Sequence, residues 1–352
     1  METLKYYIKK FWVVFPLILL SLFIFTVGII RTNQAIILKG DTVKFTSVVN
    51  LDTNYTQKGS FSTIYVSSLD KTTILQNWIA NGLNDCETYT MSESSTHLND
   101  LENYQAGKIQ YNSSIGNALV LAYTEAKKEN PDIYLDYHFV GFDVTFYSKE
   151  SKFRIGDRLY GMYVKGFKDS IVYAKDNEAE FKNALNYLNS ITKEEAQGSY
   201  FLVKRGNDEI TIEYGNQASL YGIYEWNSIK SNPTFSVSSN MIGGPSGGLL
   251  QTLSIYNQLV EEDLTHGLKI AGTGTISATG TVGAIGGVKE KVPTAYEDHV
   301  DIFFCVEANY EEAKEAYSHL PNEKMKLIPI KTFYDALDYL RGGVYSDFGI
   351  EK

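Results

Sequence analysis

Residues 243–248 read Gly-Gly-Pro-Ser-Gly-Gly, and residues 286–291 read Gly-Gly-Val-Lys-Glu-Lys. The first stretch places Ser246 at a glycine-rich bend, and the second ends on Lys291. A serine and a lysine suffice for acyl transfer without histidine, provided that the lysine is held neutral. The two stretches therefore predict a nucleophile and its general base.

The bend at Ser246 is followed by apolar residues at helical spacing, which predict a helix through Val260. Backbone N–H groups and the positive end of the helix dipole beside such a serine can stabilise an oxyanion. The flanking glycines let a substrate backbone approach closely. The alternative is that Ser246 is only an N-cap, which is the common role of a serine before a helix.

Lys291 can act as a base only if its amine loses the proton. Burial among apolar and glycine residues favours this, because it disfavours the ammonium and lowers the pKa. Lys289 is two positions away and would face nearly the opposite side of a helix, so only one of the two can point inward. The alternative is that both are solvated surface lysines.

Composition limits the classes of function. The 352 residues suffice for two or three domains. A net charge of −10 argues against a nucleic-acid partner, because no large basic surface is available for phosphates. The sequence contains no G-x-x-x-x-G-K-[ST] motif, so we expect no bound nucleotide. The histidines and the two cysteines form no metal-binding motif, so we expect no metal or other cofactor, and independent thiols at Cys86 and Cys305.

Residues 11–30 form an almost unbroken apolar run, with the length that a helix needs to cross a bilayer. The run ends without an A-x-A cleavage pattern, which favours an uncleaved anchor over a signal peptide. Lys5, Lys9 and Lys10 precede it and only Arg31 follows closely. We therefore expect a single-pass protein of the cell membrane, with a cytoplasmic N-terminus and an extracellular catalytic domain.

The remaining patterns predict a mixture of strands and helices, which is typical of the α+β class. Strands are expected at 35–38, 43–49, 60–66, 139–144, 154–159, 200–205, 209–214, 301–306 and 326–330. Helices are expected at 73–82, 115–128, 179–188, 290–298, 309–318 and 333–341. Residues 85–107 are polar and predict a loop or a mobile helix.

Three linked motifs resemble the proteolytic domain of Lon proteases. They are Gly244-Pro245-Ser246-Gly247-Gly248, Gly272-Thr273-Gly274-Thr275-Ile276 and the stretch from Gly283 to Lys291. The resemblance implies that Ser246 is the nucleophile, that Lys291 rather than Lys289 is the base, and that Thr273 lies near the lysine amine. Lon-type domains also form rings, so the resemblance implies a homo-oligomer, although no interface can be recognised in the sequence.

A closer resemblance is to the membrane-anchored, PDZ-containing Lon-like proteases of Gram-positive bacteria, which lack an ATPase module. It rests on Gly59-Ser60-Phe61, on the run 240–246 and on the PDZ-like Gly156-Asp157. It implies five parts: a cytoplasmic tail at 1–10, a transmembrane helix at 11–30, a strand-rich extracytoplasmic region at 33–114, a PDZ-like domain at 115–215 and a Lon-type domain at 216–352.

The chain departs from this pattern at three places. Gly247 replaces the usual alanine, which should loosen the bend slightly. Pro293 replaces a helix-forming residue, so the helix that carries Lys291 is expected to begin one turn late, which would change the aim of Lys291. The predicted carboxylate-binding loop of the PDZ-like domain, around 140–142, matches only weakly.

The sequence thus predicts an ATP-independent, membrane-tethered serine endopeptidase that acts on extracytoplasmic peptides or unfolded protein segments. Ser246 attacks, Lys291 transfers the proton and Thr273 supports the lysine. The alternative is a catalytically idle extracytoplasmic scaffold that binds peptides, which the changes at Pro293 and in the PDZ-like loop motivate.

Overall fold

The computed structural model describes residues 6–7, 9–12, 14–83, 86–91, 97–238, 243–322 and 324–348. It divides into two compact units, Met1–Lys39 with Val66–Ser92 and Gly40–Tyr65 with Glu93–Lys352. Much of the predicted tail 1–10, and residues 240–242 of the resembling motif, lie outside the described residues.

In the described part of the first unit, the named elements are helices and short strands. They are α2 (Val14–Ile29), β1 (Gln34–Leu38), β5 (Ser67–Leu69), α3 (Ile74–Ala80) and β6 (Cys86–Thr90). The strands form an antiparallel sheet in the order β5-β1-β6. A capping box between Thr73 and Gln76 starts α3, as the polar residues before its apolar stretch allow.

Helix α2 covers less of the chain than the predicted run 11–30. It has 16 residues, and most of its apolar side chains are exposed. Within the described ranges, no helix combines the length and the apolar content that crossing a bilayer requires.

The second unit is built on a five-stranded sheet in the order β18-β17-β14-β4-β2. Its strands are β18 (Lys326–Ile330), β17 (Ile302–Val306), β14 (Lys269–Gly272), β4 (Ser60–Ile64) and β2 (Thr42–Lys44). The first four run parallel, and β2 adds an antiparallel edge. All five residues of β17 are buried, which explains its unbroken apolar sequence, because a parallel strand is covered on both faces.

Helices and short strands surround this sheet. They are η1 (Phe45–Ser47), β3 (Val49–Leu51), β13 (Phe235–Val237), α7 (Gly248–Leu259), β15 (Thr275–Ile276), β16 (Val282–Gly283), α8 (Val288–Glu297), η2 (Glu307–Asn309), α9 (Tyr310–Ser318), α10 (Phe333–Asp338), η3 (Tyr339–Gly343) and α11 (Val344–Phe348). Every residue of α7 is buried, so α7 forms the centre of the main hydrophobic core.

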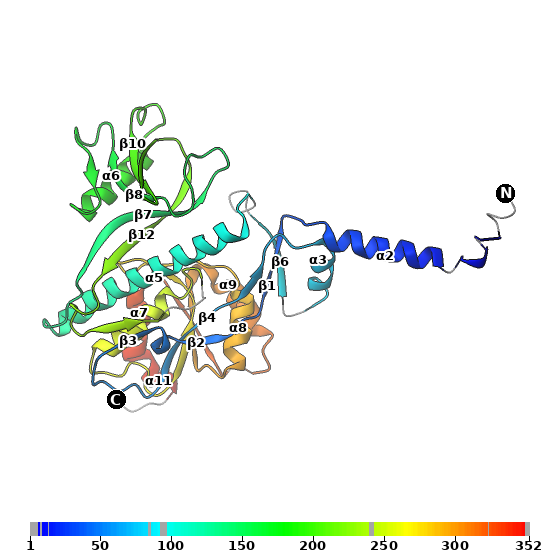
Figure 1. The fold of residues 1–352 in the computed structure, drawn as a ribbon. Helices are drawn as coiled ribbons and strands as arrows, with labels where there is room; N and C mark the ends of the chain where they lie inside the picture. The colour runs from blue at the N-terminus through cyan, green and yellow to red at the C-terminus, as the bar shows by residue number, and fades with distance from the viewer. Residues whose placement is uncertain are drawn as a thin grey trace. The chain divides into compact units, whose positions relative to one another are not determined.

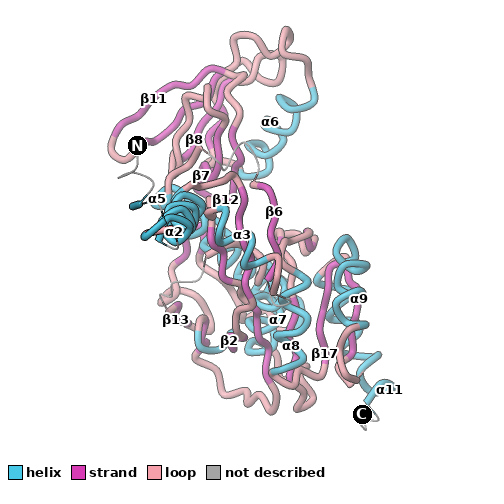
Figure 2. Tube along the Cα trace, turned by 90° about the vertical axis from the view of Figure 1, so that its right-hand side faces the viewer, coloured by secondary structure: helices cyan, strands magenta, loops and turns pink. Residues whose placement is uncertain are grey.

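A long helix, α5 (Asp100–Glu129), connects this core to a second sheet. The sheet has the order β11-β10-β8-β7-β12, and β9 pairs with β8. Its elements are β7 (Tyr137–Tyr147), β8 (Arg158–Tyr163), β9 (Val172–Tyr173), α6 (Glu178–Ser190), β10 (Tyr200–Arg205), β11 (Asp208–Glu213) and β12 (Ala218–Trp226). Figure 1 shows α5 between β7 and β12 on one side and α7 on the other. Figure 2 shows α6, β8 and β11 gathered away from α8, α9 and β17.

The structure confirms the predicted α+β class and most of the predicted elements, and it corrects four of them. The expected strand 154–159 starts only at Arg158, the first residue of β8. The stretch 85–107 was expected as a loop or a mobile helix, and it contains strand β6 as well as the first turns of helix α5. The predicted strand 43–49 is interrupted by the 3-10 turn η1. The final helix gives way to a π-helical turn at η3. Cys86 and Cys305 are free thiols, as expected. The predicted domain boundaries and the PDZ-like identity of 115–215 stay predictions.

Candidate active site

The bend that carries Ser246 is fixed by the backbone on both sides. The Gly244 N–H donates to the Gly107 carbonyl of α5 over 2.8 Å, and the Gly248 N–H donates to the Pro245 carbonyl over 3.2 Å. Ser246 is half-buried, two residues before the first residue of α7. In the described part of the chain, the N–H groups of Ser246 and Gly247 donate to no other protein group.

Lys291 reaches this bend from α8. Its side chain is only 2% exposed, and its Nζ lies 2.9 Å from Ser246 Oγ. Lys289 points elsewhere, with its Nζ 3.5 Å from a carboxylate oxygen of Glu315 on α9. The structure therefore brings the predicted base, and not its neighbour, to the predicted nucleophile.

Thr273 joins the same cluster directly after β14. Its Oγ1 accepts a hydrogen bond from Lys291 Nζ at 3.2 Å and donates to the Ser246 carbonyl at 3.2 Å. The Gly274 N–H donates to that carbonyl over 2.8 Å. Because Thr273 is fully buried, these bonds fix both the lysine amine and the backbone of the serine.

Burial lowers the pKa of Lys291 to about 8, because a charged ammonium is poorly solvated there. The neighbouring Glu290, whose side chain is also buried, opposes this with its negative charge, which raises the lysine pKa. Burial is the larger effect. A substantial fraction of Lys291 is therefore neutral near neutral pH, and a neutral amine can accept the serine proton over the observed distance.

Gly247 is required by a close approach rather than by flexibility. A Cβ at this position would lie 2.6 Å from Thr63 Oγ1 and 3.2 Å from Thr63 Cβ. Thr63 is a buried residue of β4. The expectation that glycine merely loosens the bend was wrong, since the Thr63 side chain occupies the space that an alanine methyl group would need.

Pro293 does not delay the start of α8. The helix begins at Val288, and Pro293 lies in its second turn. The Lys291 N–H, in the first turn, donates to the Gly287 carbonyl over 3.3 Å. The expected misalignment of Lys291 was therefore wrong, because the proline follows the lysine and leaves the preceding turn in place.

Sequence reasoning missed the residues that support the bend from α5 and α7. Ser114 Oγ donates to Gln251 Oε1 over 2.7 Å and lies 3.4 Å from the Pro245 carbonyl oxygen. Both side chains are buried. A polar Ser114 within an apolar helical face was the available signal, because a buried hydroxyl needs a partner.

The described residues contain no group of three or more His, Cys, Asp or Glu side chains that could hold a metal ion.

Comparison with known proteins identifies one segment. Residues 232–341 match the model of the Lon protease (S16) C-terminal proteolytic domain. This range contains Ser246, Thr273 and Lys291.

Three relatives are similar over part of the chain. The Lon protease of Mesomycoplasma hyopneumoniae is 32% identical over 97 residues, which are 28% of this chain and 11% of that protein. Lon protease 2 of Borreliella burgdorferi is 25% identical over 192 residues, 52% of this chain and 22% of that protein. The Lon protease of Campylobacter jejuni is 32% identical over 96 residues, 27% of this chain and 12% of that protein.

The chain thus spans less than a quarter of the length of these relatives. The match to the family model covers the segment in which the three site residues lie. The chain contains a Lon-type (S16) proteolytic domain, the kind of domain that supports serine peptidase activity.

Proposed function

We propose that this protein is an ATP-independent, membrane-tethered serine endopeptidase that cleaves extracytoplasmic peptides or unfolded protein segments with Ser246 and Lys291. The observation that carries the proposal is the 2.9 Å separation of Lys291 Nζ and Ser246 Oγ, with the lysine almost fully buried. A neutral lysine beside a serine at a helix N-terminus is the arrangement that activates a hydroxyl nucleophile.

In the first half of the reaction, Ser246 Oγ attacks the scissile carbonyl carbon and Lys291 Nζ takes the hydroxyl proton. The tetrahedral intermediate collapses as the C–N bond breaks, and the lysine passes the proton to the leaving amine. The product is an ester between Ser246 and the acyl part of the substrate.

In the second half, a water molecule attacks the ester carbonyl carbon, and Lys291 takes a proton from that water. The ester C–O bond breaks, the acid leaves and Ser246 recovers its proton. The N–H groups of Ser246 and Gly247 are the candidates to stabilise the oxyanion in both halves, because they lie beside the nucleophile and donate to no group among the described residues. Thr273 is a positioning residue that holds the lysine amine.

The substrate class follows from what the chain contains. Its sequence has no P-loop motif, and the matched domain is proteolytic. These two observations support short peptides, or segments that are already extended, as the substrates. Strands β7 to β11 and helix α6 lie within the predicted PDZ-like part, 115–215, and we propose that this part helps to present such segments.

The membrane tether is a separate part of the proposal. It is supported by the apolar run at 11–30 and by the exposed apolar side chains of α2. Leu19→Asp combined with Phe23→Asp places charges within this run, where each costs about 2.5–3.5 kcal/mol in a bilayer centre. We expect the full-length chain in the membrane fraction after a high-salt wash and the double variant in the supernatant. Leu69→Asp, at an exposed leucine outside the run, is the control. A soluble parent chain contradicts the tether.

The activity is tested with the full-length chain, Ser246→Ala and Lys291→Met, incubated with an unfolded protein and a peptide mixture without ATP. Mass spectrometry of the products should show cleavage by the parent and none by either variant. Lys289→Met, which removes a lysine from the same helix, should retain cleavage. Cleavage that survives in Ser246→Ala would contradict the proposed nucleophile.

The alternative is the idle peptide-binding scaffold. Two sequence changes suggested it, at Pro293 and in the PDZ-like loop. The first is now weaker support, because Lys291 still contacts Ser246 with Pro293 in the helix. A well-folded parent that binds peptides but cleaves none, with no reaction of Ser246 with serine-directed reagents, would favour the scaffold.

The predicted homo-oligomer also remains a proposal. The mass of the purified chain in solution tests it, and a monomer at all working concentrations would contradict it.

A further inference from the structure

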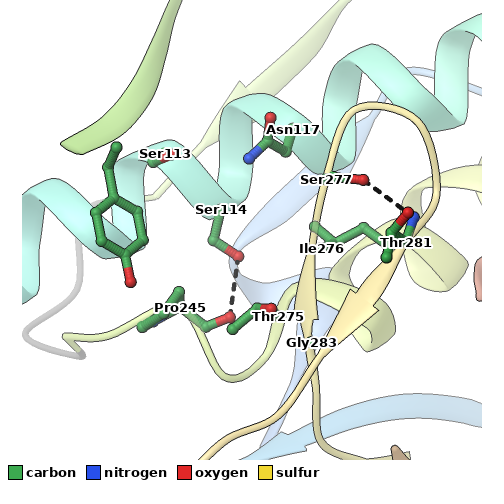
Figure 3. Close-up of a pocket in the computed structure, with 10 residues that line it drawn as sticks. Ser113, Ser114, Asn117, Pro245, Thr275, Ile276, Ser277, Thr281 and Gly283 are labelled. Atoms are coloured by element: carbon green, nitrogen blue, oxygen red, sulfur yellow. Dashed lines mark hydrogen bonds between the residues drawn. The ribbon is translucent and has the colours of Figure 1, made fainter. Parts of the chain in front are cut away.

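A cavity of about 260 Å³ lies beside the Ser246 bend. Its walls come from α5, from β12, from the bend at Pro245 and from the hairpin of β15 and β16. Figure 3 shows α5 crossing above this hairpin, with Ser114 directed at the backbone of Pro245.

The cavity adjoins the nucleophile along the chain on two sides. Pro245 directly precedes Ser246. Thr275 follows Gly274, whose N–H donates to the Ser246 carbonyl over 2.8 Å. A group that fills the cavity therefore lies against the backbone segments that hold the serine. The volume is somewhat below the roughly 300 Å³ at which pockets for small molecules begin, so it suits a side chain better than a folded partner.

The chemistry of the walls excludes charge. None of the ten described residues that line the cavity is acidic, basic or a histidine. Three of its hydroxyls already have protein partners: Ser113 bonds the Gly222 carbonyl, Ser114 bonds Gln251 and Ser277 bonds Thr279. A charged side chain would lose its water here without gaining an opposite charge, which costs free energy. An uncharged side chain avoids this cost.

Among the described residues, four lining side chains keep polar groups available: those of Asn117, Tyr221, Thr275 and Thr281. The Tyr221 phenol and the Asn117 amide are half-buried, and within the described residues neither forms a hydrogen bond with another protein group. Asn117 offers two donors and an acceptor, and Tyr221 offers a hydroxyl. Ile276 adds an apolar wall. Together they suit a medium-sized side chain with an uncharged polar group, such as that of Asn, Gln, Ser or Thr.

We infer that this cavity receives an uncharged, hydrogen-bonding side chain of the substrate next to the scissile bond, and that Asn117 and Tyr221 determine its specificity. The inference rests on the proposed peptidase function for its setting. Both residues lie outside the matched range 232–341. Selectivity is thus set by α5 and β12, and the proteolytic segment alone would lack it.

The test measures peptide binding separately from peptide cleavage. The full-length chain with Ser246→Ala is immobilised and exposed to a pooled peptide library, and retained peptides are identified by mass spectrometry. The same selection is made with Asn117→Asp added. An aspartate in the cavity supplies a negative charge, so we expect at least a tenfold relative gain of peptides with Lys or Arg at one position, over those with Asn, Gln, Ser or Thr.

Asn112→Asp is the matched control, because Asn112 is exposed on the same helix and does not line the cavity. It should leave the preference unchanged. If Asn117→Asp does not fold, Asn117→Leu keeps the size and removes the amide, and it should shift the preference toward apolar side chains.

Unchanged preferences in the folded Asn117 variant, equal shifts in the Asn112 control or no retained peptides would each overturn the inference. Cleavage by the chain with Ser246 intact is measured in parallel. The expected shift in binding without any cleavage would leave the cavity assignment standing and remove the proposed peptidase function. Cleavage without the shift in binding would overturn the cavity assignment and leave the proposed peptidase function standing.

Discussion

The amine of Lys291 must be neutral to accept the Ser246 proton, so the rate of cleavage depends on pH. With a pKa of about 8, we expect kcat/KM to rise nearly tenfold per pH unit below pH 7 and to level off above pH 9. Glu290→Gln removes the negative charge that raises this pKa, and should move the midpoint to lower pH. A profile of kcat/KM from pH 5.5 to 10 measures both. A flat profile would exclude a titrating lysine base.

The same lysine makes the folded protein less stable. Its pKa is lower in the folded state, about 8, than the ordinary 10.5, so between these values the unfolded chain binds more protons and stability rises with pH. Below pH 8, burial of the charged lysine lowers the free energy of unfolding by its full amount, about 3 kcal/mol. Lys291→Met should therefore stabilise the protein at pH 7 by about 1–3 kcal/mol while abolishing cleavage.

This gain should vanish above about pH 10.5, because the lysine is then neutral in both states. Urea unfolding at pH 7 and near pH 11 compares the two conditions. Lys289→Met, at a partly exposed lysine, controls for the loss of a positive charge and should change stability little. Equal stabilisation by the two substitutions would show that burial of Lys291 is not the cause.

Gly247 and Thr63 should be energetically coupled, because a methyl group on Gly247 meets Thr63 Oγ1 at 2.6 Å. We expect Gly247→Ala to destabilise the protein by about 1–3 kcal/mol. Thr63→Ala removes the nearest atom, so the double variant should recover part of this loss. A double-mutant cycle measured by denaturant unfolding should give a coupling of about 0.5 kcal/mol or more. Purely additive effects would contradict this packing.

At the scale of elements, Pro293 weakens α8. A proline in the second turn cannot donate to the Lys289 carbonyl, and its ring crowds that carbonyl. Pro293→Ala should restore the bond and raise the free energy of unfolding by about 1–3 kcal/mol, with little change in kcat/KM, since Lys291 precedes the proline. A large loss of activity without a loss of stability would instead show that the proline sets the aim of the lysine.

The sequence pattern predicted only the second half of helix α5. Apolar periodicity predicted 115–128, but the helix begins at Asp100, with a capping box between Asn99 and Glu102. Its first turns pack through small residues: an added Cβ at Gly107 would lie 3.7 Å from the Gly243 Cα. Contacts of this kind leave no apolar stripe, so a pattern of hydrophobic residues cannot detect them.

At the scale of the whole chain, the residues of the candidate site fall into two groups: those that a local sequence motif marks, and those that only the fold brings to the site. Ser246, Thr273 and Lys291 are marked by glycine-rich local motifs, and the structure brings all three together. Thr63 and Ser114 contact the same bend from β4 and α5, far away in sequence. No local pattern encodes such contacts, because they arise only when distant elements pack. Backbone motifs therefore predicted the candidate reacting groups, whereas the residues that support them could be found only from the fold.

Among the described residues of the second unit there are three hydrophobic cores, and two of them share α5. Leu119 belongs to the core around α7, and the adjacent Val120 belongs to the core under the β7–β12 sheet. A helix whose opposite faces are buried in two cores should make their unfolding cooperative, because neither core can lose α5 without exposing its own apolar surface.

Phe181→Ala tests this cooperation. Phe181 is fully buried in the core under the sheet, on α6, and its loss should cost about 3–5 kcal/mol. Hydrogen exchange should then become faster for the most protected amides of α6 and also for those of α7, although α7 lies in the other core. Tyr187→Ala, at a partly buried residue of the same helix, should give a smaller effect on both. If exchange accelerates in α6 while α7 keeps its protection, the sheet unfolds independently, and any influence of β12 on the site must act in the folded state alone.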